Sequence, residues 1–410
     1  MPVDRTLSRH LATFSGAYAI GVLAPLVTTP YLARALGPTG WAPVLVAQGV
    51  TALLVLVLEY GFDLSATQAL AGAESEAARA HTIRGVLAAR MLLVPIGTLL
   101  LLCLSALIPS LGRDARLVGW TLAAAIARGF SPLWIFQGLG SPERAVVVEA
   151  AGKAAAAAGV FFVVHRAGDG WRVLALQAAT SGITSAVLLR RPSARWGEQP
   201  LSFRDGWRVL REGWTVFAFR GAGALYLHAN VLLVGALASP VAVAMYGGAE
   251  RLVRSGINLL APLTQALFPR VSRAVPHGAA ATSTALREAA WILGGAGGLL
   301  SLVLLVGARP LVALLLGDAY APVVPLVRGL AALPTLVAVG TVLGIHWAIP
   351  TGRAPRFLRI VLVAGVINLV TAIALIPHLG PWGMIAGATA AEAWVAGALW
   401  RLYRQEGRAA

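Results

Sequence analysis

The sequence predicts an all-α integral membrane protein with about twelve transmembrane helices, six on either side of a polar segment. Of its 410 residues, 58% are hydrophobic and 12% are charged, and the mean hydropathy is +0.76. Apolar runs of about 20 residues, long enough to cross the hydrocarbon core of a bilayer, recur along the whole chain. This composition excludes an ordinary soluble domain.

Six spans are predicted before the polar segment. They lie at 11–36, 42–66, 85–110, 116–138, 143–165 and 170–190. Pro25 and Pro30 fall inside the first span, and Gly129 and Pro132 inside the fourth. Proline removes a backbone hydrogen bond and clashes with the preceding turn, so we expect these helices to be kinked or broken there.

Six further spans are predicted after the polar segment, at 212–237, 240–266, 286–308, 322–349, 356–377 and 380–402. Pro262 and Pro334 interrupt the eighth and the tenth. Discontinuous helices line the substrate path in many transporters, although membrane helices also tolerate proline and glycine without any such role.

The polar segment divides the chain into an N-terminal lobe at 1–190, a linker at 191–211 and a C-terminal lobe at 212–410. Residues 203–210, which include Trp207, form an amphipathic stretch that is expected to lie along the inner membrane surface. Twenty of the 33 Lys and Arg residues fall on the side of the two termini, and five on the other side. The positive-inside rule therefore places both termini in the cytoplasm.

Six basic residues lie deep in predicted spans: Arg128, Lys153, Arg220, Arg251, Arg254 and Arg328. A charge at bilayer depth is costly and normally faces the interior of a helix bundle, so these residues predict a cationic cavity and an anionic cargo. Arg34 and Arg90 lie nearer span ends, where their side chains can snorkel to the membrane surface.

Two of the basic residues have an acidic partner four residues earlier: Glu149 precedes Lys153, and Glu250 precedes Arg254. This spacing favours an ion pair along one helix face, which would neutralise the charge rather than present it to cargo. Arg251 has no acidic residue four positions earlier, so it is the better candidate for a contact with cargo.

Three further acids suggest ion coupling. Glu59 and Asp63 are one turn apart near the end of the second span, and Glu392 lies in the twelfth. Buried acids can relay protons, although each of these could equally pair with an arginine from another helix.

Four segments resemble the bacterial polysaccharide (O-antigen, Wzx-type) flippases of the multidrug/oligosaccharidyl-lipid/polysaccharide exporter superfamily. They begin at Arg34 (RALGPTGW), Leu58 (LEYGFDLSAT), Ser131 (SPLWIFQGLG) and Asn230 (NVLLVG), the last continuing through MYGGAE from Met245 to LFPR from Leu267. One departure is the run Gly138-Leu139-Gly140, because such runs usually end in Gly-Leu-Glu.

The resemblance implies two six-helix lobes around a central cationic cavity, and alternating access that carries lipid-linked oligosaccharide outward across the bacterial inner membrane. The cargo would present an anionic pyrophosphate headgroup, which arginine binds through bidentate contacts. Arg220 and Arg251 are the expected headgroup contacts, supported by Arg128, Lys153, Arg254 and Arg34. A polysaccharide polymerase is the candidate protein partner.

Other functions remain as alternatives. An ion-coupled multidrug antiporter of the same superfamily would need more acidic than basic residues in its spans to bind cationic drugs. The predicted spans of this chain hold eight basic and five acidic residues. A lipid II flippase would handle a similar headgroup. The outer loops are too short and carry too few acids for a sugar-processing enzyme. The lone Cys103 excludes disulfides, and we expect no metal, cofactor or nucleic-acid ligand.

Overall fold

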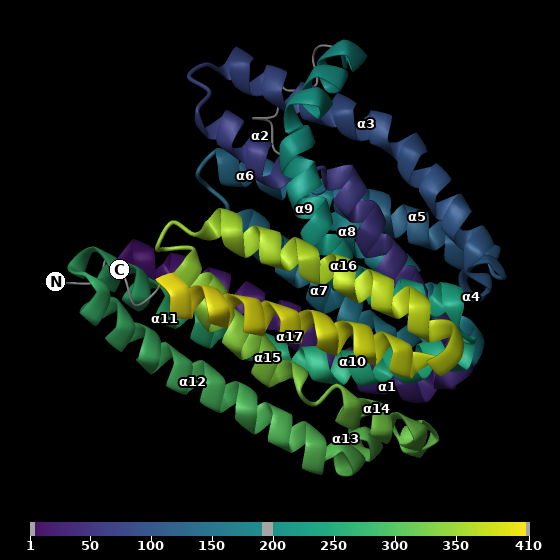
Figure 1. Cartoon of the computed structure of the whole chain (residues 1–410). Helices are drawn as coiled ribbons and strands as arrows, with labels where there is room; N and C mark the ends of the chain where they lie inside the picture. The colour runs from purple at the N-terminus through teal and green to yellow at the C-terminus, as the bar shows by residue number, and fades with distance from the viewer. Residues whose placement is uncertain (1–4, 191–199, 407–410) are drawn as a thin grey trace. The chain divides into compact units, whose positions relative to one another are not determined.

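A computed structural model describes residues 5–190 and 200–406, and the regular structure in these two ranges is entirely helical (Figure 1). Side chains are described in both ranges except at 5–15, 18, 219 and 222–228. The chain separates into two compact units, Met1–Leu232 and Leu233–Ala410. The predicted all-α class is confirmed.

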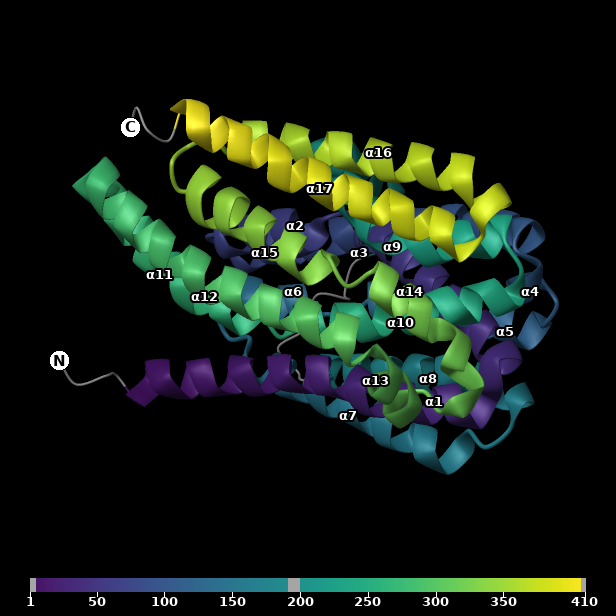
Figure 2. The same cartoon turned by 60° about the horizontal axis from the view of Figure 1, so that its bottom comes forward.

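The first unit begins with a single long helix, which lies wholly within it. Its helices are α1 (Arg5–Glu59), α2 (Phe62–Ala71), α3 (Glu76–Leu107), α4 (Pro109–Gly112), α5 (Ala115–Gly129), α6 (Leu133–Gly138), α7 (Glu143–Val163), the 3-10 turn η1 (Ala167–Asp169), α8 (Gly170–Leu189) and most of α9 (Phe203–Leu237). α1 packs against α5, α7 and α8, and Figure 2 shows α1 beside α7 and α8. α2 packs against α3 and α6.

The second unit is also helical throughout its described residues. Its elements are α10 (Pro240–Asn258), α11 (Ala261–Ala274), η3 (Val275–His277), α12 (Ala279–Val306), α13 (Ala308–Leu315), η4 (Asp318–Val323), α14 (Val324–Gly329), α15 (Leu333–Thr341), the π-helix η5 (Val342–Ala348), α16 (Ala354–Leu379) and α17 (Pro381–Glu406). α16 and α17 run side by side in opposite directions, and α12 packs against α15 and α11 (Figures 1 and 2).

Several predicted spans are broken where glycine or proline occurs. The first two predicted spans are joined in α1, with a kink at Gly37, whose φ is 64°. The fourth is divided into α5 and α6 by residues 130–132, and the eighth into α10 and α11 by residues 259–260. Pro132 and Pro262 stand at or next to the start of the second helix of each pair, where the missing N–H costs least.

Six helical segments in the described ranges are long and apolar enough to cross a membrane. They are Ala19–Ala71, Glu76–Leu107, Glu143–Val163, Ala167–Leu189, Ala279–Val306 and Ala354–Leu379. A seventh is obtained if Asp318–Gly329 and Leu333–Ala348, bent by 42°, form one broken span. The chain is therefore a multi-pass membrane protein, and the count of twelve spans stays a prediction.

The predicted linker at 191–211 is described only in part. Residues 191–199 lie outside the described ranges, and the amphipathic stretch 203–210 forms the first turns of α9, which continues without interruption to Leu237. The boundary between the compact units falls inside that helix. The division into lobes at 190 and 212 stays a prediction.

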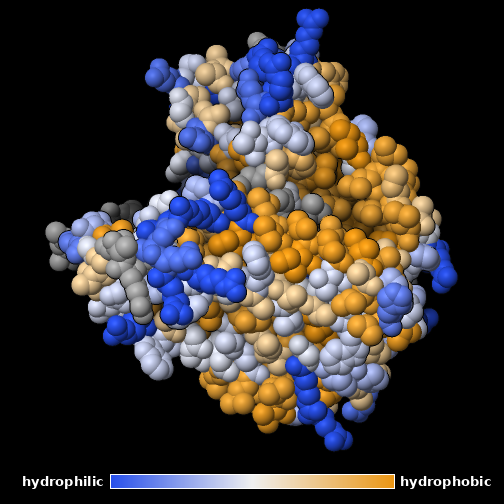
Figure 3. Space-filling model, in the orientation of Figure 1, coloured by the Kyte–Doolittle hydropathy of each residue, from blue (hydrophilic) through white to orange (hydrophobic). Residues whose placement is uncertain are grey.

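Apolar side chains cover the outer face of α16, as the orange atoms in the centre of Figure 3 show. Leu362, Val366 and Val370 are 41%, 60% and 60% exposed, at the spacing of one helix face. In water such a face would drive aggregation, whereas in a bilayer it meets lipid tails. Blue atoms gather near the end of the unit where α16 begins and α17 ends.

Candidate functional site

The site in the first unit begins at a tight turn between α1 and α2. Tyr60 and Gly61 both adopt left-handed backbone conformations, with φ of 49° and 82°. α9 packs closely on this turn: the ring of Phe217 stacks on that of Tyr60, with centroids 4.3 Å apart. A Cβ at Gly61 would lie 2.7 Å from Cγ1 of Val216. The turn therefore requires glycine both for its conformation and for the approach of α9.

This packing brings together two charged residues that are far apart in sequence. Arg220 of α9 donates from Nη1 to Oδ2 of Asp63, in the first turn of α2, and forms an ion pair with it. The two side chains are 31% and 36% exposed, so the pair is accessible from one side. The other oxygen of Asp63, Oδ1, is buried and has no hydrogen-bond partner among the described residues. Asp63 therefore retains acceptor capacity for a proton or another donor.

Arg90 of α3 is the most deeply buried arginine of this region, at 2% exposure. Its Nη1 donates to the carbonyl oxygen of Ser131 at 3.2 Å, and its guanidinium lies 5.8 Å from the ring centroid of Trp134 on α6. Its Nε has no partner in the described part of the chain. The prediction that Arg90 snorkels is wrong, because the break between α5 and α6 and the Trp134 ring enclose it.

The same break engages a carboxylate on α7. The Ser131 hydroxyl donates to Oε1 of Glu149. Arg128, in the last turn of α5, interacts electrostatically with Glu149 and with Glu59. No ion pair joins Glu149 to Lys153 among the described residues, so the predicted pair four residues apart is wrong. Lys153 is exposed on α7.

Glu59 connects these contacts into one group. It interacts electrostatically with Asp63 and with the three arginines Arg90, Arg128 and Arg220. We call this group the first-unit cluster; its members are Glu59, Asp63, Glu149, Arg90, Arg128 and Arg220. Three carboxylates oppose three guanidinium groups, so the cluster is formally neutral. Pairing of opposite charges lowers the free-energy cost of burying these side chains in a membrane-spanning unit.

The second unit holds a separate group of charges on α10. Arg254 donates from Nε to Oε1 of Glu250 at 3.0 Å, one turn away, which confirms the predicted pair. Glu250 is 8% exposed and Arg254 interacts electrostatically with Glu392 of α17 as well. Arg251, adjacent on α10, also interacts electrostatically with Glu250. We call Glu250, Arg251, Arg254 and Glu392 the second-unit cluster.

Two of the arginines predicted from sequence belong to neither cluster. Arg34 is exposed on α1, three residues before the kink at Gly37. Arg328 is exposed in the last turn of α14 and donates from Nε to the carbonyl oxygen of Leu305 at 3.2 Å. Sequence reasoning undervalued Arg90 and missed Ser131. The sequence signal for both was Ser131-Pro132 inside a predicted span. A helix break at this point leaves backbone carbonyls without helical hydrogen-bond partners, so that a buried arginine can bind one of them.

Known structures share this fold. An inward-facing multidrug resistance MATE family transporter of the MOP superfamily aligns with a TM-score of 0.73 and 16% sequence identity, covering 98% of each chain. A eukaryotic MATE transporter aligns with a TM-score of 0.54, again at 16% identity, over 97% of this chain and 98% of its own. At such identities the likeness shows the fold alone.

Sequence relatives point to a narrower group. A protein of Escherichia coli K12 named "Putative O-antigen transporter" is 25% identical over 89% of this chain and 88% of its own length. A protein of Shigella dysenteriae with the same name is 27% identical, with coverages of 88% and 91%. The family model described as "Polysaccharide biosynthesis protein" matches residues 9–275, more than half of the chain. The chain is therefore a member of the polysaccharide biosynthesis protein family, built on the fold of the MATE transporters.

Proposed function

We propose that this protein is a flippase that moves polyprenyl-pyrophosphate-linked oligosaccharide from the cytoplasmic to the periplasmic face of the bacterial inner membrane, for cell-surface polysaccharide biosynthesis. Family membership, two full-length relatives named as O-antigen transporters and the fold of a membrane transporter support this proposal. Both termini would face the cytoplasm, in keeping with the distribution of arginines.

The observation that carries the proposal furthest is the pairing of Arg220 with Asp63. In the absence of cargo, Asp63 neutralises Arg220 through this ion pair. A pyrophosphate offers more acceptor oxygens and more negative charge than one carboxylate, so it can replace Asp63 as the partner of Arg220. Arg251 is the corresponding headgroup contact proposed in the second unit, and Arg128, Lys153, Arg254 and Arg34 are the further proposed cargo contacts.

Displacement of Asp63 from Arg220 by the cargo has an electrostatic consequence. The first-unit cluster is neutral without cargo, and the arrival of an anion would leave Glu59 and Asp63 short of positive charge. Uptake of a proton by one of these acids would restore neutrality while cargo is bound, and loss of that proton would return Asp63 to Arg220 and expel the headgroup. Glu59 and Asp63 are thus the ion-coupling groups of the proposal, and Glu392 has the same place in the second-unit cluster.

An ion-coupled multidrug antiporter is the second candidate, because the solved structures that share the fold include a multidrug transporter. The predicted spans hold eight basic and five acidic residues, which argues against cationic cargo. The equal numbers of acids and arginines in the first-unit cluster weaken that argument. A lipid II flippase is a closer variant, since it too would bind a pyrophosphate headgroup.

Deletion of the gene in its native host, followed by extraction of lipid-linked glycans and determination of their membrane face, tests these functions. The flippase proposal predicts complete oligosaccharide on the cytoplasmic face. Accumulation of the peptidoglycan precursor would instead identify a lipid II flippase. Unchanged glycan intermediates with altered tolerance to cationic compounds would overturn the proposal in favour of the antiporter.

A further inference from the structure

A cavity of about 190 Å³ opens in the second unit, apart from both charged clusters, where α12 begins and α17 ends. Its polar lining comes from Thr282, Ser283, Thr351 and Arg353, and its aromatic lining from Trp347 and Tyr403. The proposed transport cycle uses none of these residues. The cavity lies at the arginine-rich end of α16 and α17, which the positive-inside rule assigns to the cytoplasm.

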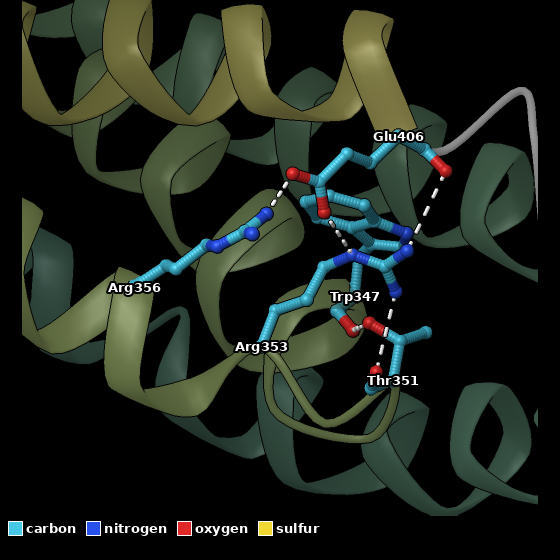
Figure 4. Close-up of polar contacts among 5 residues, drawn as sticks. All are labelled: Trp347, Thr351, Arg353, Arg356 and Glu406. Carbon is cyan, nitrogen blue, oxygen red and sulfur yellow. Dashed lines mark hydrogen bonds and ion pairs between the residues drawn. The ribbon is translucent and has the colours of Figure 1, made fainter.

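Arg353 is held in place on one wall of this cavity. Its Nε donates to Oε2 of Glu406 at 3.0 Å, and its Nη1 donates to the carbonyl oxygen of Thr351 at 3.2 Å (Figure 4). Its guanidinium lies 5.0 Å from the ring centroid of Trp347, and Tyr403 meets that ring edge-on at 5.1 Å. The side chain is only 19% exposed, so its orientation is set before any ligand arrives.

The charge around the cavity is positive. Glu406 is the counterion of both Arg353 and Arg356, so one carboxylate serves two guanidinium groups (Figure 4). Glu406 is the last residue of α17, and its side chain is 31% exposed, against 19% for Arg353. α12 also begins at the cavity without a side-chain cap at Gly278, so the positive end of its dipole adds to the two arginines.

A phosphate group fits this environment better than a carboxylate does. Glu406 already supplies a carboxylate, and its two side-chain oxygens are divided between Arg353 and Arg356. A phosphate can accept from the guanidinium of Arg353, which lines the cavity, and retain free oxygens for the first turn of α12. The volume of about 190 Å³ admits a phosphate with its ester oxygen, and the aromatic walls suit the carbon chain of an ester.

We infer that this cavity is a binding site for a phosphate-bearing anion, either the headgroup of an anionic phospholipid or a free phosphate, and that the anion binds by displacing Glu406 from Arg353. The inference is independent of which cargo the protein carries, because it concerns occupancy of the cavity and not translocation.

The experiment uses the full chain purified in a maltoside detergent, which contains no phosphate. Thermal unfolding is followed while inorganic phosphate, short-chain phosphatidylglycerol or zwitterionic short-chain phosphatidylcholine is added at constant ionic strength. A ligand that binds the folded state raises Tm with its concentration, and the half-saturating concentration gives an apparent Kd. Stabilisation by inorganic phosphate assigns the site to free phosphate, and stabilisation by phosphatidylglycerol alone assigns it to lipid.

Three variants test the mechanism of binding. Arg353→Gln should raise the apparent Kd about tenfold or more, because a charge-assisted contact is lost. Glu406→Gln should lower it several-fold, because the competing carboxylate is neutralised. Arg359→Gln, an exposed arginine of α16 outside the cavity, is the matched control and should leave the Kd unchanged.

A purely structural role for the Arg353 and Glu406 pair predicts a different pattern, in which both substitutions lower the starting Tm and neither changes anion binding. That result, or equal effects of Arg353→Gln and Arg359→Gln, would overturn the inference. If Arg353→Gln does not fold, the result for Glu406→Gln decides. Tighter anion binding by Glu406→Gln supports displacement of Glu406 from Arg353, and unchanged or weaker binding refutes it.

Discussion

The two units hold their membrane-embedded charges in opposite ways. In the first unit the ion pair of Arg220 and Asp63 joins residues 157 positions apart, and Ser131 bridges Arg90 and Glu149 from a helix break. In the second unit Glu250 and Arg254 pair within one turn of α10. A local pair survives any movement of its helix as a body, whereas a long-range pair breaks when its helices separate. The Arg220 and Asp63 pair is therefore the one that a separation of helices would break, whereas the Glu250 and Arg254 pair would persist.

The largest effect is expected from Arg220→Ala. If the first-unit cluster binds cargo, surface glycan should fall at least about tenfold, because a charge-assisted contact to the headgroup is lost. The measurement is surface polysaccharide in a host that carries only the variant, with protein level checked by immunoblot.

Arg254→Ala is the matched control in the other unit. If it reduces glycan as strongly as Arg220→Ala at equal protein level, the distinction drawn between the two units is wrong. Normal glycan with Arg220→Ala would contradict the proposed function of the cluster itself.

The next effect concerns the turn that brings α9 to α2. Gly61→Ala should destabilise the protein by more than the roughly 1–2 kcal/mol that a left-handed conformation costs an L-residue, because its Cβ would also meet Val216. Gly140→Ala is the matched control, since Gly140 has φ of 72° with open space around its Cβ position. Thermal unfolding should show the larger loss for Gly61→Ala, and equal losses would mean that the close approach of α9 matters little.

A smaller effect is expected from Glu250→Gln. It leaves Arg254 without its nearest counterion in a part-buried position, and we expect a loss of about 1–3 kcal/mol in the free energy of unfolding. Because Glu392 also interacts with Arg254, the loss should lie at the lower end. The double variant Glu250→Gln/Arg254→Gln should recover part of it, and no recovery would show that the pair is not the source of the effect.

The smallest effect is expected from Lys153→Gln. This side chain is exposed and forms no ion pair with Glu149, so stability should change by less than about 0.5 kcal/mol. A larger loss in a thermal unfolding experiment would show that Lys153 contributes to the first-unit cluster after all. Reduced surface glycan at unchanged stability would instead support its predicted place on the cargo path.

The same contrast explains what could be predicted from the sequence. Apolar runs reveal the helices, and a spacing of four residues on one helix reveals Glu250 and Arg254, because both signals are local. The same spacing misled at Glu149, where Ser131, in the break between α5 and α6, competes for the carboxylate. Arg90 was placed near a membrane surface from its position along a span, but its burial depends on Trp134 and on the break at Ser131. Pairing between helices depends on packing that no local pattern contains.

The central claim is that the protein translocates lipid-linked oligosaccharide through contacts that include Arg220. The most direct measurement is transport in proteoliposomes, in which purified lipid-linked oligosaccharide is present in one leaflet and its appearance in the other is followed with a membrane-impermeant glycosidase. We predict translocation with the wild-type protein and loss of it with an equal amount of folded Arg220→Ala. Equal transport by both proteins, or transport by neither, would contradict the account.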